Sequence, residues 1–186
     1  MAERVRLGVL LSGGGRSLQN LIDRTRSGAL AAEIAVVVSD RAGVQGITRA
    51  EAAGVPVFVE RDADATFAHL REGRVDLVCL AGYLRLLKIP ADFAGRVLNI
   101  HPALLPKFGG KGFYGHAVHE AVLAAGESES GCTVHLCTEE YDRGPIVVQR
   151  RVPVLPGDDA DTLAARVFEA ECEAYPEAIV RWMERR

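Results

Sequence analysis

Short apolar segments alternate with amphipathic ones along most of this chain, and this alternation restricts its fold more than any other feature. Val5–Leu11 is a continuous apolar run that ends at three glycines, and residues 17–26 then carry Leu18, Leu21 and Ile22 at helical spacing. Further strands are expected at residues 34–38, 57–59, 77–81 and 97–100, and further helices at residues 44–53 and 117–125. Strands that are apolar on both faces are typical of a parallel sheet covered by helices on both sides.

The pattern changes after Gly126, where less helix separates the strands. Residues 132–137 and 146–154 are both strand-like, and the turn-rich link at residues 140–145 is short for a crossover, which favours an antiparallel pair. Residues 161–174 and 178–183 are expected to form the closing helices. The 186 residues therefore predict one α/β domain, a doubly wound, mostly parallel sheet with an antiparallel C-terminal strand, with ligands at the carboxyl ends of the strands.

Composition and charge favour a small-molecule enzyme. Hydrophobic residues make up 48% and charged residues 25% of the chain, which are globular proportions, and the formal net charge is only −3. Such a balance provides no basic surface for nucleic acid or an anionic membrane. Four cysteines in apolar segments suit a reducing compartment, glycines interrupt the first apolar run, and none of the apolar runs reaches membrane-spanning length. We expect a cytoplasmic protein with neither a nucleic-acid nor a membrane partner.

The glycine-rich turn at residues 12–17 lies where the first strand meets the first helix, so its N–H groups can converge on an anion. A P-loop is excluded because Gly-Lys-Ser/Thr does not follow. Gly13 and Gly15 fit a dinucleotide fingerprint whose third glycine is replaced by Leu18, and Asp40 could hold a ribose, so a nucleotide-dependent oxidoreductase stays open. A simple tight turn is the other alternative, although Arg16 in the first helical turn favours a phosphate.

Asn99 and His101 form a polar pair at the end of the expected strand at residues 97–100. Alternation along a strand places these two side chains on one face, and Pro102 ends the ladder directly after them. An amide N–H and an imidazolium N–H that lie side by side can donate to the same developing oxyanion, and imidazole can move a proton near neutral pH. The alternative is that both side chains only satisfy the backbone of the following loop.

The run Asn-Ile-His-Pro-Ala-Leu-Leu-Pro at residues 99–106 strongly resembles the signature of the folate-dependent formyltransferases. Residues 112–115 and 119–122 are similar to the branch of that family that formylates phosphoribosylglycinamide (glycinamide ribonucleotide). Further matching segments, in the same order, are residues 80–87, 131–135, 142–146 and 171–176, so the resemblance covers nearly the whole chain. It implies a Rossmann-like formyltransferase fold over residues 1–186, with an N-terminal half that binds phosphate and a C-terminal half that binds folate.

The resemblance also implies the reaction. A formyl group would pass from 10-formyltetrahydrofolate, the co-substrate, to the amine of glycinamide ribonucleotide in purine biosynthesis, by direct attack and without a metal. Asn99 and a protonated His101 would stabilise the tetrahedral oxyanion, and Asp142 would assist proton transfer. From the residues alone, Asp142 before Gly144-Pro145 would be a turn former, so its role depends on the resemblance.

The resemblance assigns substrate contacts by position. Gly15, Arg16 and Ser17 align with the phosphate-binding turn, where Arg16-Ser17 replaces the usual Ser or Thr followed by Asn, and Glu171 aligns with the acid that holds the substrate amine. Folate contacts are implied for Leu84, Arg85, Leu86, Leu87, Asn99, Thr138, Glu139, Glu140, Tyr141 and Asp142, with Arg61 as a weak match for the arginine that holds the folate glutamate and His135 as a supporting group.

Simpler roles remain open for several of these residues. Leu84, Leu86 and Leu87 could be ordinary core residues, and Glu171 could be a solvated helix charge. The whole chain could also be a ligand-binding module without catalysis. The expected partners are glycinamide ribonucleotide and reduced folate, bound by a monomer or a homodimer.

Overall fold

The computed structural model describes residues 4–185, which fall into two compact units with the boundary between Leu98 and Asn99. Within residues 4–185, none of the helices combines the length and apolar character needed to cross a bilayer.

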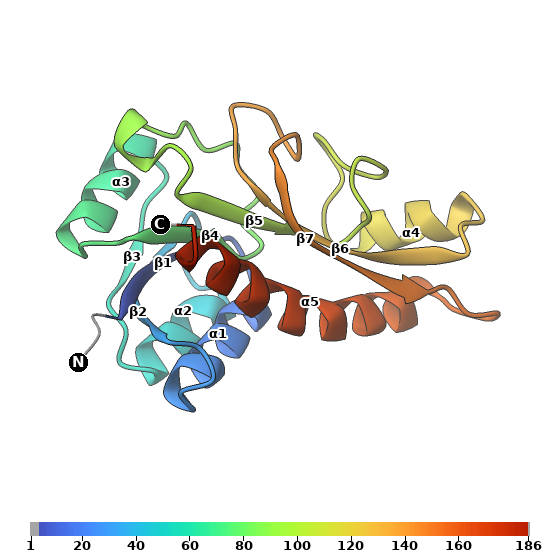
Figure 1. Cartoon of the computed structure of the whole chain (residues 1–186), viewed down its shortest axis with the longest axis horizontal. Helices are drawn as coiled ribbons and strands as arrows, with labels where there is room; N and C mark the ends of the chain where they lie inside the picture. The colour runs from blue at the N-terminus through green and yellow to red at the C-terminus, as the bar shows by residue number, and fades with distance from the viewer. Residues whose placement is uncertain (1–3, 186) are drawn as a thin grey trace. The chain divides into compact units, whose positions relative to one another are not determined.

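The first unit is a parallel sheet with helices between its strands (Figure 1). Its strands lie in the order β3-β2-β1-β4, and the three neighbouring pairs are all parallel. Figure 1 shows α1 and α2 together on one face of this sheet and α3 on the other, which is the doubly wound arrangement. In chain order the elements are β1 (Val5–Leu11), α1 (Arg16–Arg26), β2 (Ala32–Ser39), α2 (Gln45–Ala52), β3 (Val57–Val59), α3 (Ala63–Glu72), β4 (Leu77–Leu80) and a 3-10 turn at Ala91–Phe93.

The second unit continues from β5 (Val97–His101), whose first two residues close the first unit. Its strands follow the order β5-β6-β7, and β6 (Glu129–Leu136) and β7 (Ile146–Pro153) are antiparallel. The helix α4 (His116–Ala124) precedes β6, and α5 (Ala160–Met183) packs along both β6 and β7. The predicted fold class, an α/β fold with parallel strands and an antiparallel C-terminal strand, is confirmed.

One helix was not predicted, and one expectation about helices was wrong. The pattern did not predict α3, because only Thr66, Phe67 and Leu70 of its ten residues are buried and its apolar signal is weak; Asp62 caps its N-terminus by accepting from the Ala65 N–H. The two expected closing helices are one continuous α5 that passes through Pro176. Proline removes one helical hydrogen bond, but α5 is buried on both sides of it, and this packing outweighs the local cost.

Candidate active site

Asn99, His101 and Asp142 lie together at the carboxyl end of β5. Asp142 belongs to the link between β6 and β7, where its φ of 55° puts it in the left-handed region that aspartate tolerates better than most residues. Its Oδ1 accepts from Asn99 Nδ2 at 3.3 Å, and its Oδ2 lies 3.6 Å from His101 Nδ1. The structure therefore brings together the three side chains that were expected from the sequence to carry catalysis.

The Asp142 side chain is 9% exposed and is well supplied with hydrogen-bond donors. The Gly110 N–H donates to Oδ2 at 2.9 Å, and Gly109 passes so close that an added Cβ would lie 3.3 Å from the Asp142 Cβ. Burial raises the pKa of Asp142, but the neighbouring His135 and His101 rings and the Gly110 N–H together hold this pKa below its ordinary value. Asp142 is thus a fixed, ionised carboxylate at neutral pH.

His101 has an acceptor beside each of its two ring nitrogens. Its Nε2 lies 2.7 Å from the Phe108 carbonyl oxygen, which can only accept, so Nε2 carries a hydrogen and Nδ1 faces Asp142. Burial lowers the pKa of His101, although Asp142 and the Phe108 carbonyl both act to raise it. The family resemblance implies a protonated ring, and an Nδ1–H directed at the Asp142 carboxylate is the form that this neighbour stabilises.

Asn99 is oriented by two acceptors. His135, which is 1% exposed, donates from Nδ1 to the Leu136 carbonyl at 3.0 Å, so its Nε2 can accept from Asn99 Nδ2 at 3.2 Å. The second N–H of the same amide points to Asp142. The opposite amide orientation would face the Asn99 oxygen toward the carboxylate, so the chemistry supports an amide nitrogen directed at Asp142. His135 therefore helps to fix the orientation of the Asn99 amide.

The turn that was expected to bind phosphate lies in the first unit, and packing gives a structural reason for one of its glycines. Gly15 caps α1 with a φ of 68°, and an added Cβ would lie only 2.7 Å from the Gly46 Cα, so close contact between α1 and α2 requires glycine here. Arg16 is exposed and Ser17 half-buried in the first turn of α1, which has no side-chain cap. The N-terminus of α1 is therefore available to an anion.

Sequence reasoning missed Arg49 beside this turn. Its Nε donates to the Gly14 carbonyl at 2.9 Å and its Nη1 to Gln19 Oε1 at 3.2 Å. These bonds hold a positive charge against the turn from α2. The sequence contains no signal for this contact, because 35 residues separate Arg49 from Gly14.

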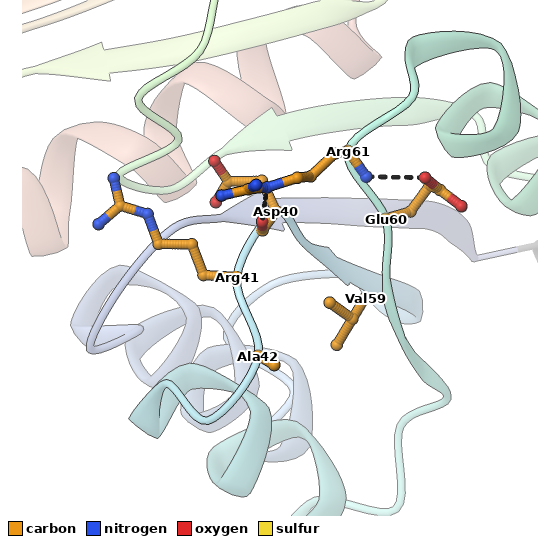
Figure 2. Close-up of a pocket in the computed structure, with 6 residues that line it drawn as sticks. All are labelled: Asp40, Arg41, Ala42, Val59, Glu60 and Arg61. Atoms are coloured by element: carbon orange, nitrogen blue, oxygen red, sulfur yellow. Dashed lines mark hydrogen bonds between the residues drawn. The ribbon is translucent and has the colours of Figure 1, made fainter.

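Arg61 lines a cavity of ≈ 410 Å³ in the first unit, together with Asp40, Arg41, Ala42, Val59 and Glu60 (Figure 2). Its Nε donates to the Asp40 carbonyl at 3.0 Å, and its backbone N–H donates to Glu60 Oε1 at 2.8 Å. Asp40 itself is 3% exposed, and its Oδ1 has no hydrogen-bond partner within the part of the chain that the structure describes. Arg61 is thus fixed at its Nε, and its side chain lies at the cavity.

The remaining expected contacts differ in their exposure. Leu84 and Leu86 are 36% and 51% exposed, whereas Leu87 is a 5% exposed core residue. Arg85, Thr138, Glu139 and Glu140 are exposed, and Tyr141 and Glu171 are half-buried.

Burial, followed by the charge of Glu171, raises the pKa of Cys132 to about 12, so this thiol is not a nucleophile. Over residues 4–185, His, Cys, Asp and Glu side chains form no group of three or more that could hold a metal ion.

Comparison with known proteins shows which sequences this chain is similar to. Residues 5–179 match the family described as formyl transferase. Over 95% of its length the chain is 46% identical to a trifunctional purine biosynthetic protein adenosine-3 of Drosophila pseudoobscura pseudoobscura, of which it spans only 14%. It is also 40% identical to a phosphoribosylglycinamide formyltransferase of Haemophilus influenzae, of which it spans 86%.

Solved structures agree with this result. A glycinamide ribonucleotide transformylase 1 from Symbiobacterium toebii is 42% identical, with a TM-score of 0.88 over 96% of this chain and 87% of that one. A phosphoribosylglycinamide formyltransferase from Brucella melitensis is 45% identical, with a TM-score of 0.85 over 95% of this chain and 94% of that one. The resemblance of the motifs is confirmed, and the chain belongs to the formyl transferase family.

Proposed function

We propose that this chain transfers the formyl group of 10-formyltetrahydrofolate to the amine of glycinamide ribonucleotide, a step of purine biosynthesis. The observation that carries the proposal is the cluster of Asn99, His101 and Asp142 at the carboxyl end of β5, in a chain that is 40% identical to a named phosphoribosylglycinamide formyltransferase over 95% of its length. The proposed setting is the cytoplasm, and the proposed assembly is a monomer or a homodimer.

The attacking amine forms a bond to the formyl carbon, and the carbonyl electrons move onto oxygen. The Asn99 amide makes two hydrogen bonds, to His135 and to Asp142, and gives up one of them to donate to this oxyanion. His101, already protonated when the substrates bind, is the second donor through Nδ1, and the charge on Asp142, 3.6 Å away, stabilises this imidazolium. It keeps its proton throughout the step.

Asp142 handles the proton that the attacking nitrogen must lose. Its ionised carboxylate accepts this proton, directly or through one water, and returns it to N10 of the folate as the bond between that nitrogen and the formyl carbon breaks. Formylated ribonucleotide and tetrahydrofolate leave, and the carboxylate is ionised again. The step needs neither a metal nor a covalent bond to the protein.

Substrate contacts are proposed by position. In the first unit, the N-terminus of α1 with Gly15, Arg16 and Ser17 would hold the phosphate, with support from Arg49. Glu171 would hold the substrate amine, and Arg61 the folate glutamate. The proposed folate contacts are Leu84, Arg85, Leu86, Thr138, Glu139, Glu140 and Tyr141, whereas the buried Leu87 supports its neighbours from the core.

The test combines purified protein, glycinamide ribonucleotide and 10-formyltetrahydrofolate and follows the mass of the ribonucleotide. The proposal predicts conversion to the formylated product only when both substrates are present. Binding of both without product would instead indicate a ligand-binding module. A change in nicotinamide absorbance in place of formyl transfer would indicate the oxidoreductase that Gly13, Gly15 and Asp40 leave open.

A further inference from the structure

Gln149 on β7 makes two hydrogen bonds that lead toward the proposed active site. Its side-chain Nε2 donates to the Leu105 carbonyl at 3.1 Å and to Thr133 Oγ1 at 2.9 Å. Gln149 lies 44 residues from Leu105 along the chain, so this contact ties the loop after β5 to the far strand of the β6–β7 pair. The proposed chemistry gives Gln149 no role.

Thr133 completes the connection from β6. Its side chain is fully buried, its hydroxyl donates to the Ala103 carbonyl at 2.7 Å, and its Oγ1 accepts from the Leu105 N–H at 3.1 Å. Together, Gln149 and Thr133 hold both backbone groups of Leu105 and the carbonyl of Ala103. We call these four hydrogen bonds the Gln149 clamp.

The clamped residue contacts the backbone that holds the proposed catalytic groups. An added Cβ on Gly109 would clash with Leu105 Cδ2, so the Leu105 side chain fills the space beside this glycine. The residues on either side of Gly109 then do two things: the Phe108 carbonyl accepts from His101 Nε2, and the Gly110 N–H donates to Asp142. A displacement of Leu105 would therefore be passed to both His101 and Asp142.

We infer that Gln149 is a positioning residue for formyl transfer, which acts through Leu105 on the His101–Phe108 and Asp142–Gly110 hydrogen bonds. The inference rests on the roles proposed for His101 and Asp142 in formyl transfer. Glutamine suits the position because its single NH₂ group can donate to a carbonyl and a hydroxyl at once. A methionine of similar size would leave the buried Leu105 carbonyl without this donor, and a misplacement of about 1 Å at a reacting group can cost about a hundredfold in rate.

The first experiment compares the steady-state kinetics of Gln149→Met, Thr133→Val and Thr133→Ser. The inference predicts that the first two lower kcat by about tenfold to a hundredfold, while KM for each substrate changes by less than about threefold, because the chemical step and not binding is disturbed. Thr133→Ser keeps the hydroxyl and should recover most of kcat. Arg151→Gln, on the same strand with a side chain that is 64% exposed, is the matched control and should leave kcat unchanged.

The second experiment uses ¹⁵N NMR of histidine-labelled protein, without substrates, to determine which ring nitrogen of His101 carries the hydrogen. The inference predicts the Nε2–H form of His101 in the parent chain and a mixture of Nε2–H and Nδ1–H forms in Gln149→Met. An unchanged His101 signal, with activity lost only in proportion to unfolded protein, would overturn it. Asp142→Asn separates the two proposals. Full activity of Asp142→Asn contradicts the proposed chemistry. If Asp142→Asn loses activity but Gln149→Met remains fully active, only the positioning role of the Gln149 clamp is contradicted.

Discussion

The Asp142 carboxylate lies 3.6 Å from His101 Nδ1, which is too long for a good hydrogen bond but close enough for strong electrostatic coupling. The same carboxylate is fixed by Gly110 and Asn99, so its position does not depend on His101. Asp142 is thus ionised and held in place beside an imidazole whose pKa burial lowers and the carboxylate raises. The fixed carboxylate stabilises the imidazolium form of His101, which is the form that can donate to an oxyanion.

Asn99→Leu removes the amide of the proposed oxyanion site while keeping a side chain of similar size. We expect kcat to fall by about a hundredfold to a thousandfold, because one donor to the developing charge is lost. KM for both substrates should change much less, since the donor acts mainly in the transition state. Steady-state kinetics at saturating folate measures both effects. A rise in KM at constant kcat would show that Asn99 contributes to ground-state binding instead.

Arg16→Ala tests the proposed phosphate contact in the first turn of α1. Loss of a charge-assisted hydrogen bond should raise KM for glycinamide ribonucleotide by about tenfold or more and leave KM for the folate within about twofold. Arg24→Ala, in the last turn of the same helix, is the matched control and should leave both values unchanged. Equal effects of Arg16→Ala on the two substrates would contradict a phosphate contact.

Gly15→Ala tests the structural role of the same turn. An alanine here would have to adopt a φ of 68° with its Cβ 2.7 Å from the Gly46 Cα, so we expect the free energy of unfolding to fall by about 2 kcal/mol. Gly14→Ala is the control, because its Cβ would meet nothing closer than the flexible end of Gln45 at 3.9 Å. Urea unfolding of the two variants allows the comparison, and equal stability would contradict the close packing of α1 on α2.

The buried His119 makes stability depend on pH. Burial, with the charges of His116 and His101, lowers its pKa from 6.5 to about 4, so between these values the unfolded chain binds more protons than the folded one. Stability should therefore fall as pH decreases from 6.5 toward 4, by up to about 1.4 kcal/mol per pH unit for this one group. His119→Gln should flatten this slope, and the exposed His116→Gln should change it less. An identical slope in parent and His119→Gln would contradict the assignment.

Much of the fold could be predicted because its signals are local. Val5–Leu11 and Val57–Val59 stand out as apolar runs bounded by turns, and the short link before Ile146 correctly predicted an antiparallel pair. The helix α3 lacked a strong apolar stripe, and the two closing helices expected at residues 161–174 and 178–183 are one helix, because the packing of α5 overrides Pro176. Both misses come from long-range packing that a window of sequence does not contain.

The candidate site likewise contains some residues with a local sequence signal and others without one. Alternation along β5 pairs Asn99 with His101, but nothing local to Asp142 distinguishes it from a turn former, so only the family resemblance linked it to them. The Gly110 N–H, Arg49 and Gln149 have no local signal, because each acts on a partner distant in the sequence. The lowered pKa of His101 has no local signal either, since it depends on burial that the strand pattern does not fix.

The central claim is that Asp142 carries the proton during formyl transfer, and Asp142→Asn tests it most directly. The amide keeps the size of the side chain but cannot take up the proton, so single-turnover formylation at saturating substrates should slow by at least about a hundredfold. Isothermal titration should still detect both substrates bound by the variant. Formylation by Asp142→Asn at the parent rate would contradict the account.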